Sequence, residues 1–476
     1  MKKVVIIGAG VIGSAIAREL SKYQLDINVF EKENDVCEVT SMANSAIVHS
    51  GYDPKPGTLK AKLNVLGNKL FDQLSEDLGF EFNRIGSLTV GFDESSLETL
   101  KELQKNGLEN GVETKILNKE ETIAIEPNVN KNVMYSLLAP TCGIVNPFEY
   151  TVALMENAVD NGVKLHLCEE VLDIKHDGKY IIKTEKGEYE ADIIIDAAGL
   201  GSAKIAHMIN NNDYEISPRK GEYFVLDHFS EDFVKHTIFP LPTNKGKGIL
   251  ITPTTHGNYL LGPTSEFVDD KEDFSTDALT LDKVKEGVVS VCDNIPFYQT
   301  IRSFAGLRAV ATGNDFIIKE DEKEEGFYHV AGIQSPGLAS SYAIAMYIKD
   351  LINEKYTLEE NENFNGHRRP FVKLNKMSDE EKNEYFKKDP KFANLICRCE
   401  KISEGEILDV IHRSVGATTV RGVKKRVRPG FGKCQGGFCE PRVVKLLAKE
   451  LGKDETEILK GRRDSVITKY VTKEDR

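Results

Sequence analysis

The chain opens with a short apolar run that leads straight into three closely spaced glycines. Residues 4–7 are all Val or Ile, as in strands buried in a parallel sheet, and a helical pattern follows. Gly8 allows a tight turn, Gly10 lets the backbone approach a pyrophosphate, and Gly13 permits close packing of the helix on the strand. We therefore expect the chain to begin with the strand–turn–helix unit of an α/β fold.

A second strand and an acidic residue complete this unit. Residues 25–30 are predicted to form the strand, and Glu31 follows it, 23 residues after Gly8. A carboxylate at this place accepts hydrogen bonds from a ribose diol, and the free N–H groups at the start of the helix bind phosphates. Glycine-rich helix starts also occur for packing alone, but the order strand, turn, helix, strand, acid favours dinucleotide binding. The unit by itself is compatible with either NAD or FAD.

The N-terminal segment also has features of a secretory leader, because two lysines precede the apolar run. The glycines interrupt that run, and a helical pattern continues through residues 18–20 in place of a cleavage site. No uninterrupted apolar stretch reaches about 20 residues, so no membrane span is expected. Eight cysteines in 476 residues are too few for a disulfide scaffold and are typical of a cytoplasmic protein.

Two further glycine-bearing strand patterns lie far downstream, at residues 191–199 and 326–332, and the second leads into a helix after Gly337. With these segments the chain resembles the FAD-dependent oxidoreductases of the D-amino-acid oxidase superfamily. Within that superfamily it is most similar to the glycerol-3-phosphate dehydrogenase and L-2-hydroxyglutarate dehydrogenase group. The resemblance covers roughly residues 1–352. Residues 40–51 resemble the family's loop that passes the flavin ring. Four further segments resemble the group's substrate-domain strands: residues 219–223, 251–254, 261–264 and 304–308.

The resemblance implies a discontinuous α/β fold, Rossmann-like in the FAD-binding part. We expect residues 1–352 to form the oxidoreductase domain, with FAD-binding layers at about 1–80, 140–210 and 310–352. The stretches between these layers are expected to form an α+β substrate domain with an antiparallel sheet. Residues 353–395 are polar and are predicted to be a partly helical surface linker.

The resemblance also implies which residues contact FAD. Val171 would place its backbone against the adenine, and the helix after Gly337 would direct its positive N-terminus at the flavin pyrimidine. The predicted FAD-binding residues are Gly8, Gly10, Gly13, Glu31, Ser45, Val171, Gly199, Gly332, Gly337 and Leu338.

Three residues are predicted to act on the substrate. His49 lies in the loop that resembles the flavin-binding loop and is a candidate base or hydrogen-bonding group, although an ordinary loop histidine is the alternative. Arg308 lies where the group carries an arginine that binds the substrate's anion, because a guanidinium suits phosphate or carboxylate. Lys220 and Arg302 are further anion-binding candidates, and His236 could line the pocket, with a surface histidine as the alternative.

The end of the chain differs in charge from the rest. Residues 391–476 contain 20 Lys and Arg against 12 Asp and Glu, whereas residues 1–390 carry a net charge of −21. A basic tail can bind nucleic acid, but an acidic body repels phosphate backbones, so no nucleic-acid partner is expected.

This basic tail holds four of the eight cysteines, with one residue between the first two and four between the last two. Four thiolates can hold zinc or a [2Fe–2S] cluster, and a C-x-C pair is unusual for zinc. One glycine-rich segment, residues 428–433, precedes the second pair, and another, residues 435–438, lies between its two cysteines. Residues 396–476 resemble the bacterioferritin-associated-ferredoxin-like [2Fe–2S] domain that ends some glycerol-3-phosphate dehydrogenases and nitrite reductases. This favours a small helical domain with a [2Fe–2S] cluster on Cys397, Cys399, Cys434 and Cys439, with zinc and unligated thiols as alternatives.

Together these features predict an FAD-dependent dehydrogenase of a small anionic secondary alcohol. Glycerol-3-phosphate, oxidised to dihydroxyacetone phosphate, is the leading substrate; L-2-hydroxyglutarate is the second choice and an amino acid the third. A hydride would pass to the flavin and single electrons through the cluster to a partner, either a second flavoprotein or a quinone-linked subunit. The protein would be cytoplasmic, or peripheral to a membrane through that partner. A flavin and iron–sulfur electron carrier without a substrate is the alternative of a different class.

Overall fold

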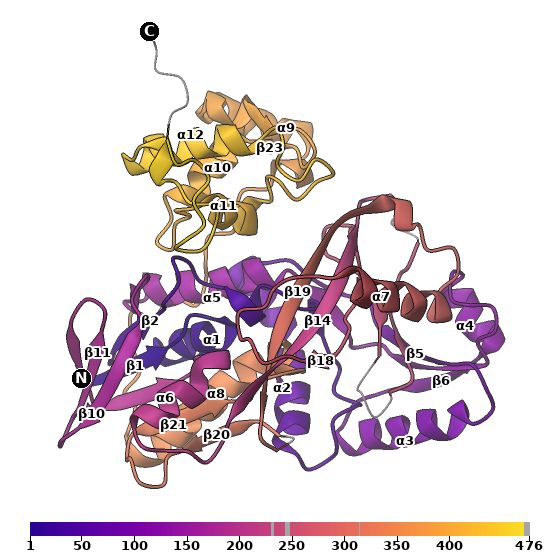
Figure 1. The fold of residues 1–476 in the computed structure, drawn as a ribbon, viewed down its shortest axis with the longest axis horizontal. Helices are drawn as coiled ribbons and strands as arrows, with labels where there is room; N and C mark the ends of the chain where they lie inside the picture. The colour runs from indigo at the N-terminus through magenta and orange to yellow at the C-terminus, as the bar shows by residue number, and fades with distance from the viewer. Residues whose placement is uncertain (230–232, 243–247, 314, 471–476) are drawn as a thin grey trace.

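The computed structural model describes residues 1–229, 233–242, 248–313 and 315–470 (Figure 1). The last six residues of the predicted tail domain, 471–476, lie outside the described residues. A six-stranded sheet forms the centre of the FAD-binding part, and β1 lies between β13 and β2 in parallel register. Segments distant in sequence therefore meet in one sheet, as the resemblance predicts. In spatial order its strands are β20 (Ile317–Glu320), β21 (Phe327–Ala331), β13 (Ile193–Asp196), β1 (Lys2–Ile7), β2 (Leu25–Phe30) and β9 (Lys164–His166).

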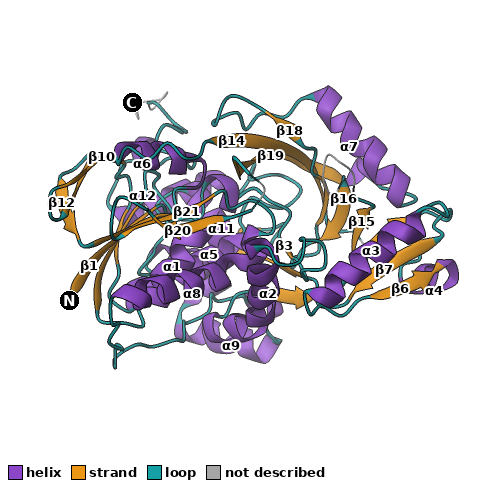
Figure 2. Cartoon of the chain, turned by 90° about the horizontal axis from the view of Figure 1, so that it is seen from below, coloured by secondary structure: helices purple, strands orange, loops and turns teal. Residues whose placement is uncertain are grey.

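The apolar residues of β1 alternate between two cores, because successive side chains of a strand point to opposite faces. Val4 and Ile6 pack with the helices on one face, and Val5 and Ile7 pack against a small antiparallel sheet on the other. The central helix α1 contacts both α5 and α8, and Figure 2 shows these helices lying together. The helices of the FAD-binding part are α1 (Val11–Leu20), α2 (Leu59–Leu78), α5 (Pro147–Asp160), α6 (Ser202–Met208) and α8 (Gly337–Lys355). The small sheet consists of β10 (Val171–His176), β11 (Tyr180–Thr184) and β12 (Glu188–Ala191), and a second three-stranded sheet of β3 (Ile47–Val48), β8 (Gly143–Val145) and β4 (Phe82–Arg84).

A large curved sheet forms the substrate domain (Figure 2). Its two longest strands, β14 (Ile216–Leu226) and β19 (Thr300–Ala311), pair antiparallel along most of their length. The predicted antiparallel character is confirmed except at one place, where β15 pairs with β5 in parallel. The other strands of the sheet are β5 (Ser87–Gly91), β6 (Lys115–Asn118), β7 (Tyr135–Ala139), β15 (Thr237–Pro240), β16 (Leu250–Pro253), β17 (Tyr259–Gly262) and β18 (Glu266–Phe267). Helices α3 (Ser96–Glu109), α4 (Lys119–Ile125) and α7 (Ala278–Val291) belong to the same part of the chain.

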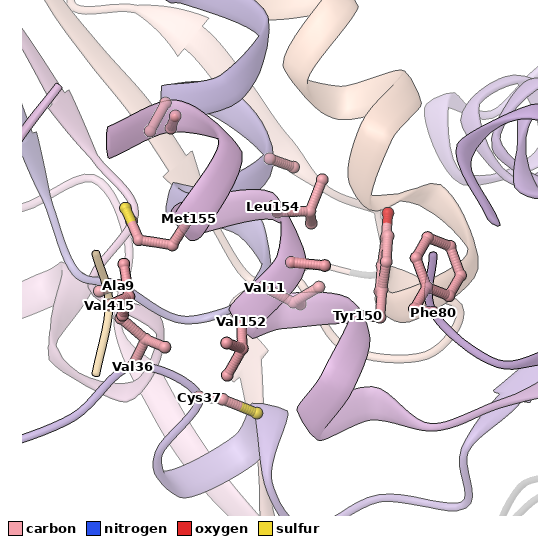
Figure 3. Packing of buried hydrophobic residues seen from close by; sticks show 14 of the residues in the cluster. Ala9, Val11, Val36, Cys37, Phe80, Tyr150, Val152, Leu154, Met155 and Val415 are labelled. Carbon is pink, nitrogen blue, oxygen red and sulfur yellow. The ribbon is translucent and has the colours of Figure 1, made fainter. Parts of the chain in front are cut away.

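The C-terminal part is helical and lies on one side of the FAD-binding part (Figure 1). A capping box starts α10, because Ser403 Oγ accepts the Glu406 N–H and Glu406 Oε2 accepts the Ser403 N–H. The two parts share an apolar core, in which Val415 of the tail lies beside Ala9 and Val36 (Figure 3). The tail is therefore packed onto the FAD-binding part. Its elements are β22 (Leu395–Cys397), β23 (Ile402–Ser403), α10 (Glu404–Ile411), α11 (Val420–Val427) and α12 (Glu440–Leu451).

The segment between the two parts is partly helical, with α9 at Asp379–Lys388. Arg368 in this segment is buried, where it forms an ion pair with Glu156 of α5 and donates to the Leu78 carbonyl at 3.1 Å. Such an ion pair holds the connecting segment against the body of the protein.

Candidate active site

A cavity of about 1380 Å³ lies between the central sheet and the long strands of the substrate domain. Of the residues predicted to bind FAD, eight line this cavity: Gly8, Gly10, Glu31, Ser45, Val171, Gly199, Gly337 and Leu338. Gly13 and Gly332 are not among its lining residues. Gly13 serves packing, because a Cβ there would lie 1.9 Å from the Gly8 carbonyl oxygen, and one at Gly332 would lie 2.6 Å from the Ala311 Cβ.

The glycine turn brings the N-terminus of α1 to this cavity. Gly8 has φ +104°, which glycine adopts readily, and a Cβ there would meet the Ala197 carbonyl oxygen at 2.7 Å. No side chain caps α1 at Gly10, and Val11 donates its N–H to Ser41 Oγ at 2.9 Å. The open helix end, with its partial positive charge, suits a pyrophosphate.

Glu31 is held beside this turn by two backbone donors. Its Oε2 accepts the Ala9 N–H at 2.8 Å and its Oε1 accepts the Glu33 N–H at 2.9 Å. Burial raises the pKa of the Glu31 carboxyl, although both hydrogen bonds oppose this. Further lone pairs of the carboxyl oxygens can accept ribose hydroxyls, so the residues present fit an adenine dinucleotide.

Polar side chains of residues 45–49 contact β14 and the segment that leads into α8. Ser45 Oγ is 3.1 Å from the Tyr223 hydroxyl, and His49 Nε2 is 3.5 Å from Ser335 Oγ. The His49 ring also lies 5.9 Å from the Phe239 ring, centroid to centroid. All five residues line the cavity, so the loop meets the helix end predicted to face the flavin.

Two arginines face each other across β14 and β19. Arg219 and Arg308 are direct partners in the antiparallel register, and both line the cavity. Burial lowers the pKa of Arg219, and the charge of Arg308 lowers it further. Like charges directly opposite each other destabilise a sheet, so this pair is suited to an anionic ligand between or beside the guanidiniums. Arg219 was not among the predicted site residues.

Lys220 lies on the other face of β14, and the structure does not bring it to the cavity with Arg308. Its Nζ is 2.8 Å from Asp273 Oδ2 and 3.5 Å from Glu222 Oε1. Burial lowers the pKa of Lys220, but these carboxylates outweigh that and raise it. Because side chains alternate along a strand, only one of Arg219 and Lys220 can face the cavity.

The other two candidates, His236 and Arg302, also lie elsewhere. His236 Nδ1 is 3.1 Å from Glu126 Oε2, and neither residue lines the cavity. Arg302 is close enough to Arg421 of the tail for the two charges to interact; burial lowers the pKa of Arg302, and Arg421 adds to that. Arg302 therefore belongs to the boundary between the substrate domain and the tail.

The four tail cysteines lie in two pairs. The Sγ atoms of Cys399 and Cys434 are 3.7 Å apart, and Cys397 is hydrogen-bonded to Cys439, which lowers the pKa of Cys397 to about 6. Within the described residues, no group of three or more His, Cys, Asp or Glu side chains is placed to hold one metal ion. Structural zinc takes four ligands on one ion, whereas each iron of a [2Fe–2S] cluster takes two protein ligands. Two thiol pairs therefore fit the cluster better than zinc.

Backbone N–H groups surround these sulfurs. The N–H groups of Glu400 and Gly430 are directed at the Cys397 sulfur, and those of Gly436 and Phe438 at the Cys434 sulfur. Such donors stabilise thiolates and set the potential of an iron–sulfur centre. The glycines at 430 and 436 have positive φ, so the glycine-rich segments allow the backbone to turn its N–H groups inward.

Buried ion pairs join the tail to the loop that leads into the cavity. Lys425 Nζ is 3.0 Å from Asp35 Oδ2 and 2.7 Å from Glu38 Oε1, and Arg426 also binds Asp35. Glu38 and Ser41 both line the cavity. We call the tail, residues 396–476, the cysteine domain. The 35–41 loop therefore contacts the cysteine domain at one end and the cofactor cavity at the other.

Residues 3–351 match the family described as FAD dependent oxidoreductase, and residues 395–449 match the BFD-like [2Fe-2S] binding domain. The chain therefore belongs to the FAD-dependent oxidoreductase family, and it carries a C-terminal [2Fe–2S]-binding domain. The predicted fold class and the two predicted cofactors, FAD and a [2Fe–2S] cluster, are confirmed. In the described part of the chain, no helix is long and apolar enough to span a membrane.

Individual relatives narrow the comparison. The chain is 49% identical, over the full length of both, to the glycerol 3-phosphate dehydrogenase of Caloramator mitchellensis. It is 26% identical to anaerobic glycerol-3-phosphate dehydrogenase subunit A1 of Haloferax volcanii, over 94% of this chain and 84% of that protein. The FAD-bound L-α-glycerophosphate oxidase of Mycoplasma pneumoniae has a similar structure, with a TM-score of 0.74 and 32% identity over 78% of this chain and 100% of that one.

Proposed function

We propose that the protein is a glycerol-3-phosphate dehydrogenase that delivers electrons through its cysteine domain to a separate acceptor protein. The observation that carries this proposal is the arginine pair, Arg219 and Arg308, opposed in register on the cavity wall. A phosphate monoester carries close to two negative charges at neutral pH and offers three acceptor oxygens. Its charge and its three oxygens can serve both guanidiniums at once, whereas a carboxylate offers one charge and two oxygens.

The relatives support the same substrate. A protein that shares 49% identity over its full length, tail included, is named a glycerol 3-phosphate dehydrogenase. The similar oxidase structure aligns over its whole length and yet covers only 78% of this chain. The relative named as a dehydrogenase therefore matches the tail, whereas the oxidase structure does not cover the whole chain. An oxidase passes its electrons to oxygen, so an additional redox domain suits a protein that delivers electrons to another protein.

In this proposal His49 takes the proton of the substrate's secondary hydroxyl. Its ring lines the same cavity as the arginine pair and lies beside Ser335, two residues before the start of α8. A base must reach the hydroxyl while the carbon-bound hydrogen faces the hydride acceptor, which bound FAD would supply. The arginines hold the phosphate, and that positions the reacting carbon relative to His49.

The electron acceptor is a second flavoprotein or a quinone-linked subunit. A relative named as subunit A1 of an anaerobic dehydrogenase supports an assembly of several chains. The proposed location is the cytoplasm. If the acceptor is membrane-bound, the protein would lie at the membrane surface through that acceptor.

The test is anaerobic reduction of the purified holoprotein by candidate substrates. Millimolar glycerol-3-phosphate is expected to bleach the flavin absorbance, and L-2-hydroxyglutarate and amino acids are expected not to. Bleaching by 2-hydroxy acids alone would assign the arginine pair to a carboxylate and overturn the proposed substrate. Bleaching only by a reduced redox protein would make the chain an electron carrier.

A further inference from the structure

The cysteine domain has one side closed against the rest of the protein and one side open. On the closed side, Lys425 and Arg426 of α11 are buried against Asp35 and Glu38. Phe431 also packs on Phe148 of α5, with ring centroids 5.8 Å apart. Figure 1 shows α11 next to the FAD-binding part and α12 on the far side of the domain.

An exposed aromatic residue lies in the sequence between two of the cysteines. Phe438 is 84% exposed, although it lies between Cys434 and the buried Cys439. Leu395, two residues before Cys397, is also exposed, and Arg442 of α12 donates to its carbonyl oxygen at 2.9 Å. Single exposed apolar side chains are common on protein surfaces, but one beside a redox centre is in a position to contact an electron-transfer partner.

Basic residues lie close in sequence to the same four cysteines. Arg398, Lys401, Lys433 and Arg442 are all exposed, and none of the first three forms an ion pair with a described residue. Of the neighbouring acids, Glu400 pairs with Arg428 at 2.9 Å and Glu440 pairs with Lys460, while Glu404 accepts from the Asn394 amide, so the four cations outnumber the acids that have no cationic partner. The field at this surface is therefore positive, and Cys399 is exposed within it.

We infer that Phe438, Leu395 and the surrounding basic residues Arg398, Lys401, Lys433 and Arg442 form the docking surface for the electron acceptor, which is a protein with an acidic rim around an apolar centre. We name this set the exit surface. The inference rests on the proposed function and adds where the electrons leave. One electron passes to one acceptor centre per encounter, so two encounters clear the electron pair taken from one substrate molecule.

Other occupants fit the exit surface less well. The basic side chains would suit an anionic lipid headgroup, but the apolar face of α12, the helix that follows Phe438, is buried in the core and is not free to enter a membrane. A second copy of the chain would offer its acidic body, residues 1–390, but an acceptor for the electrons would still be needed. An acidic redox protein satisfies both the charge and the chemistry.

The test uses soluble cytochromes as probes and does not depend on glycerol-3-phosphate. The holoprotein is reduced with dithionite, freed of excess reductant and mixed with an acidic b-type cytochrome or a basic c-type cytochrome. The acidic cytochrome is expected to bind and to be reduced at a rate that falls at least tenfold when salt rises from about 20 to about 500 mM, because screening weakens steering between surface charges. A rate independent of salt, or faster reduction of the basic cytochrome at low salt, would overturn the inference.

Variants then locate the surface. Arg398→Glu/Lys433→Glu is expected to slow reduction of the acidic cytochrome at least tenfold at low salt and to weaken its binding in calorimetry. Lys401→Glu/Arg442→Glu tests the surface again should the first variant lose iron. Lys101→Glu, an exposed change on α3, is the matched control and is expected to change neither rate nor binding. Iron content and dye reduction with glycerol-3-phosphate are measured on each variant, so that loss of the cluster or of the proposed function is separated from loss of docking.

Three outcomes would assign the surface differently and overturn the inference. The variants could bind the acidic cytochrome as the unaltered protein does. The protein could bind vesicles of anionic phospholipid through these residues while ignoring the acidic cytochrome. The protein could form dimers that the charge reversal dissolves, which sedimentation at several concentrations would detect.

Discussion

Arg426 and Asp35 form a buried, two-pronged ion pair, in which Nη1 lies 2.8 Å from Oδ2 and Nη2 lies 2.9 Å from Oδ1. The two residues are separated by 391 positions and join the cysteine domain to the loop that leads into the cofactor cavity. Lys425 adds a second cation to the same carboxylate at 3.0 Å. The cysteine domain is thereby fixed relative to the flavin site, which suits electron transfer within the chain.

The first prediction concerns the pH dependence of this junction. Burial alone would raise the pKa of Asp35, but Arg426 and then Lys425 hold it well below its ordinary value. A depressed carboxyl pKa gives stability that is complete above the unfolded pKa of about 4 and is lost as the pH falls towards the folded pKa. We expect the melting temperature to fall from pH 5 to pH 3, with release of the cysteine domain detected by limited proteolysis.

Asp35→Asn provides the comparison for this prediction. It leaves two buried cations without their shared carboxylate, so about 3–5 kcal/mol of stability is expected to be lost at pH 7. The difference between the variant and the unaltered protein should narrow as the pH falls below 4. A difference that stays constant from pH 7 to pH 3 would show that Asp35 is not the group that titrates.

The second prediction tests the arginine pair. Arg308→Ala or Arg219→Ala is expected to lower kcat/KM for glycerol-3-phosphate about 10- to 150-fold, since a charge-assisted hydrogen bond contributes ~1.5–3 kcal/mol. Lys220→Ala is the matched control, because that side chain faces Asp273 on the other side of the strand, and kcat/KM should change less than about threefold. Steady-state kinetics with FAD content measured on each variant decide the point. A larger effect from Lys220 than from Arg219 would reassign the anion site.

The comparison of Arg219 with Lys220 shows where sequence reasoning ends. The glycine turn at residues 8–13 and the cysteine spacing are local patterns, and the chemistry they require follows from that spacing. The choice between two adjacent cations depends on which face of β14 meets the cavity, and that is set by the pairing with β19. The ion pair of Asp35 with Arg426 depends on how the domains dock. No local sequence pattern around either residue predicts this contact.

The third prediction tests the ligands of the cluster. Cys434→Ser is expected to remove most of the about two iron atoms expected per chain for a [2Fe–2S] cluster, while FAD stays bound. FAD should stay because its cavity is lined by other parts of the chain. Cys168→Ser, at a half-buried cysteine outside the tail, is the control and should leave the iron content unchanged. Zinc in the unaltered protein in place of iron, found by metal analysis, would contradict the cluster.

The last prediction concerns how the protein sets the potential of the cluster. The Lys424 ammonium lies 4.5 Å from the centre of the Phe431 ring, and Phe431 follows Gly430, whose N–H is directed at the Cys397 sulfur. Burial lowers the pKa of Lys424 to about 7, and the charge of Arg302 lowers it further, so the side chain is mostly charged only below pH 7. A reduced cluster adds one negative charge, which the charged ammonium stabilises.

At about pH 6, where the Lys424 ammonium is mostly charged, Lys424→Met is therefore expected to lower the reduction potential of the cluster by about 30–60 mV, equal to ~0.7–1.4 kcal/mol for one electron. The potential is measured by a redox titration followed by EPR, which reports the cluster without any substrate. Lys449→Met removes the same charge from an exposed position on α12 and is the control, with an expected shift below about 10 mV because solvent screens its charge. An unchanged or higher potential in Lys424→Met would show that the cation does not act on the cluster.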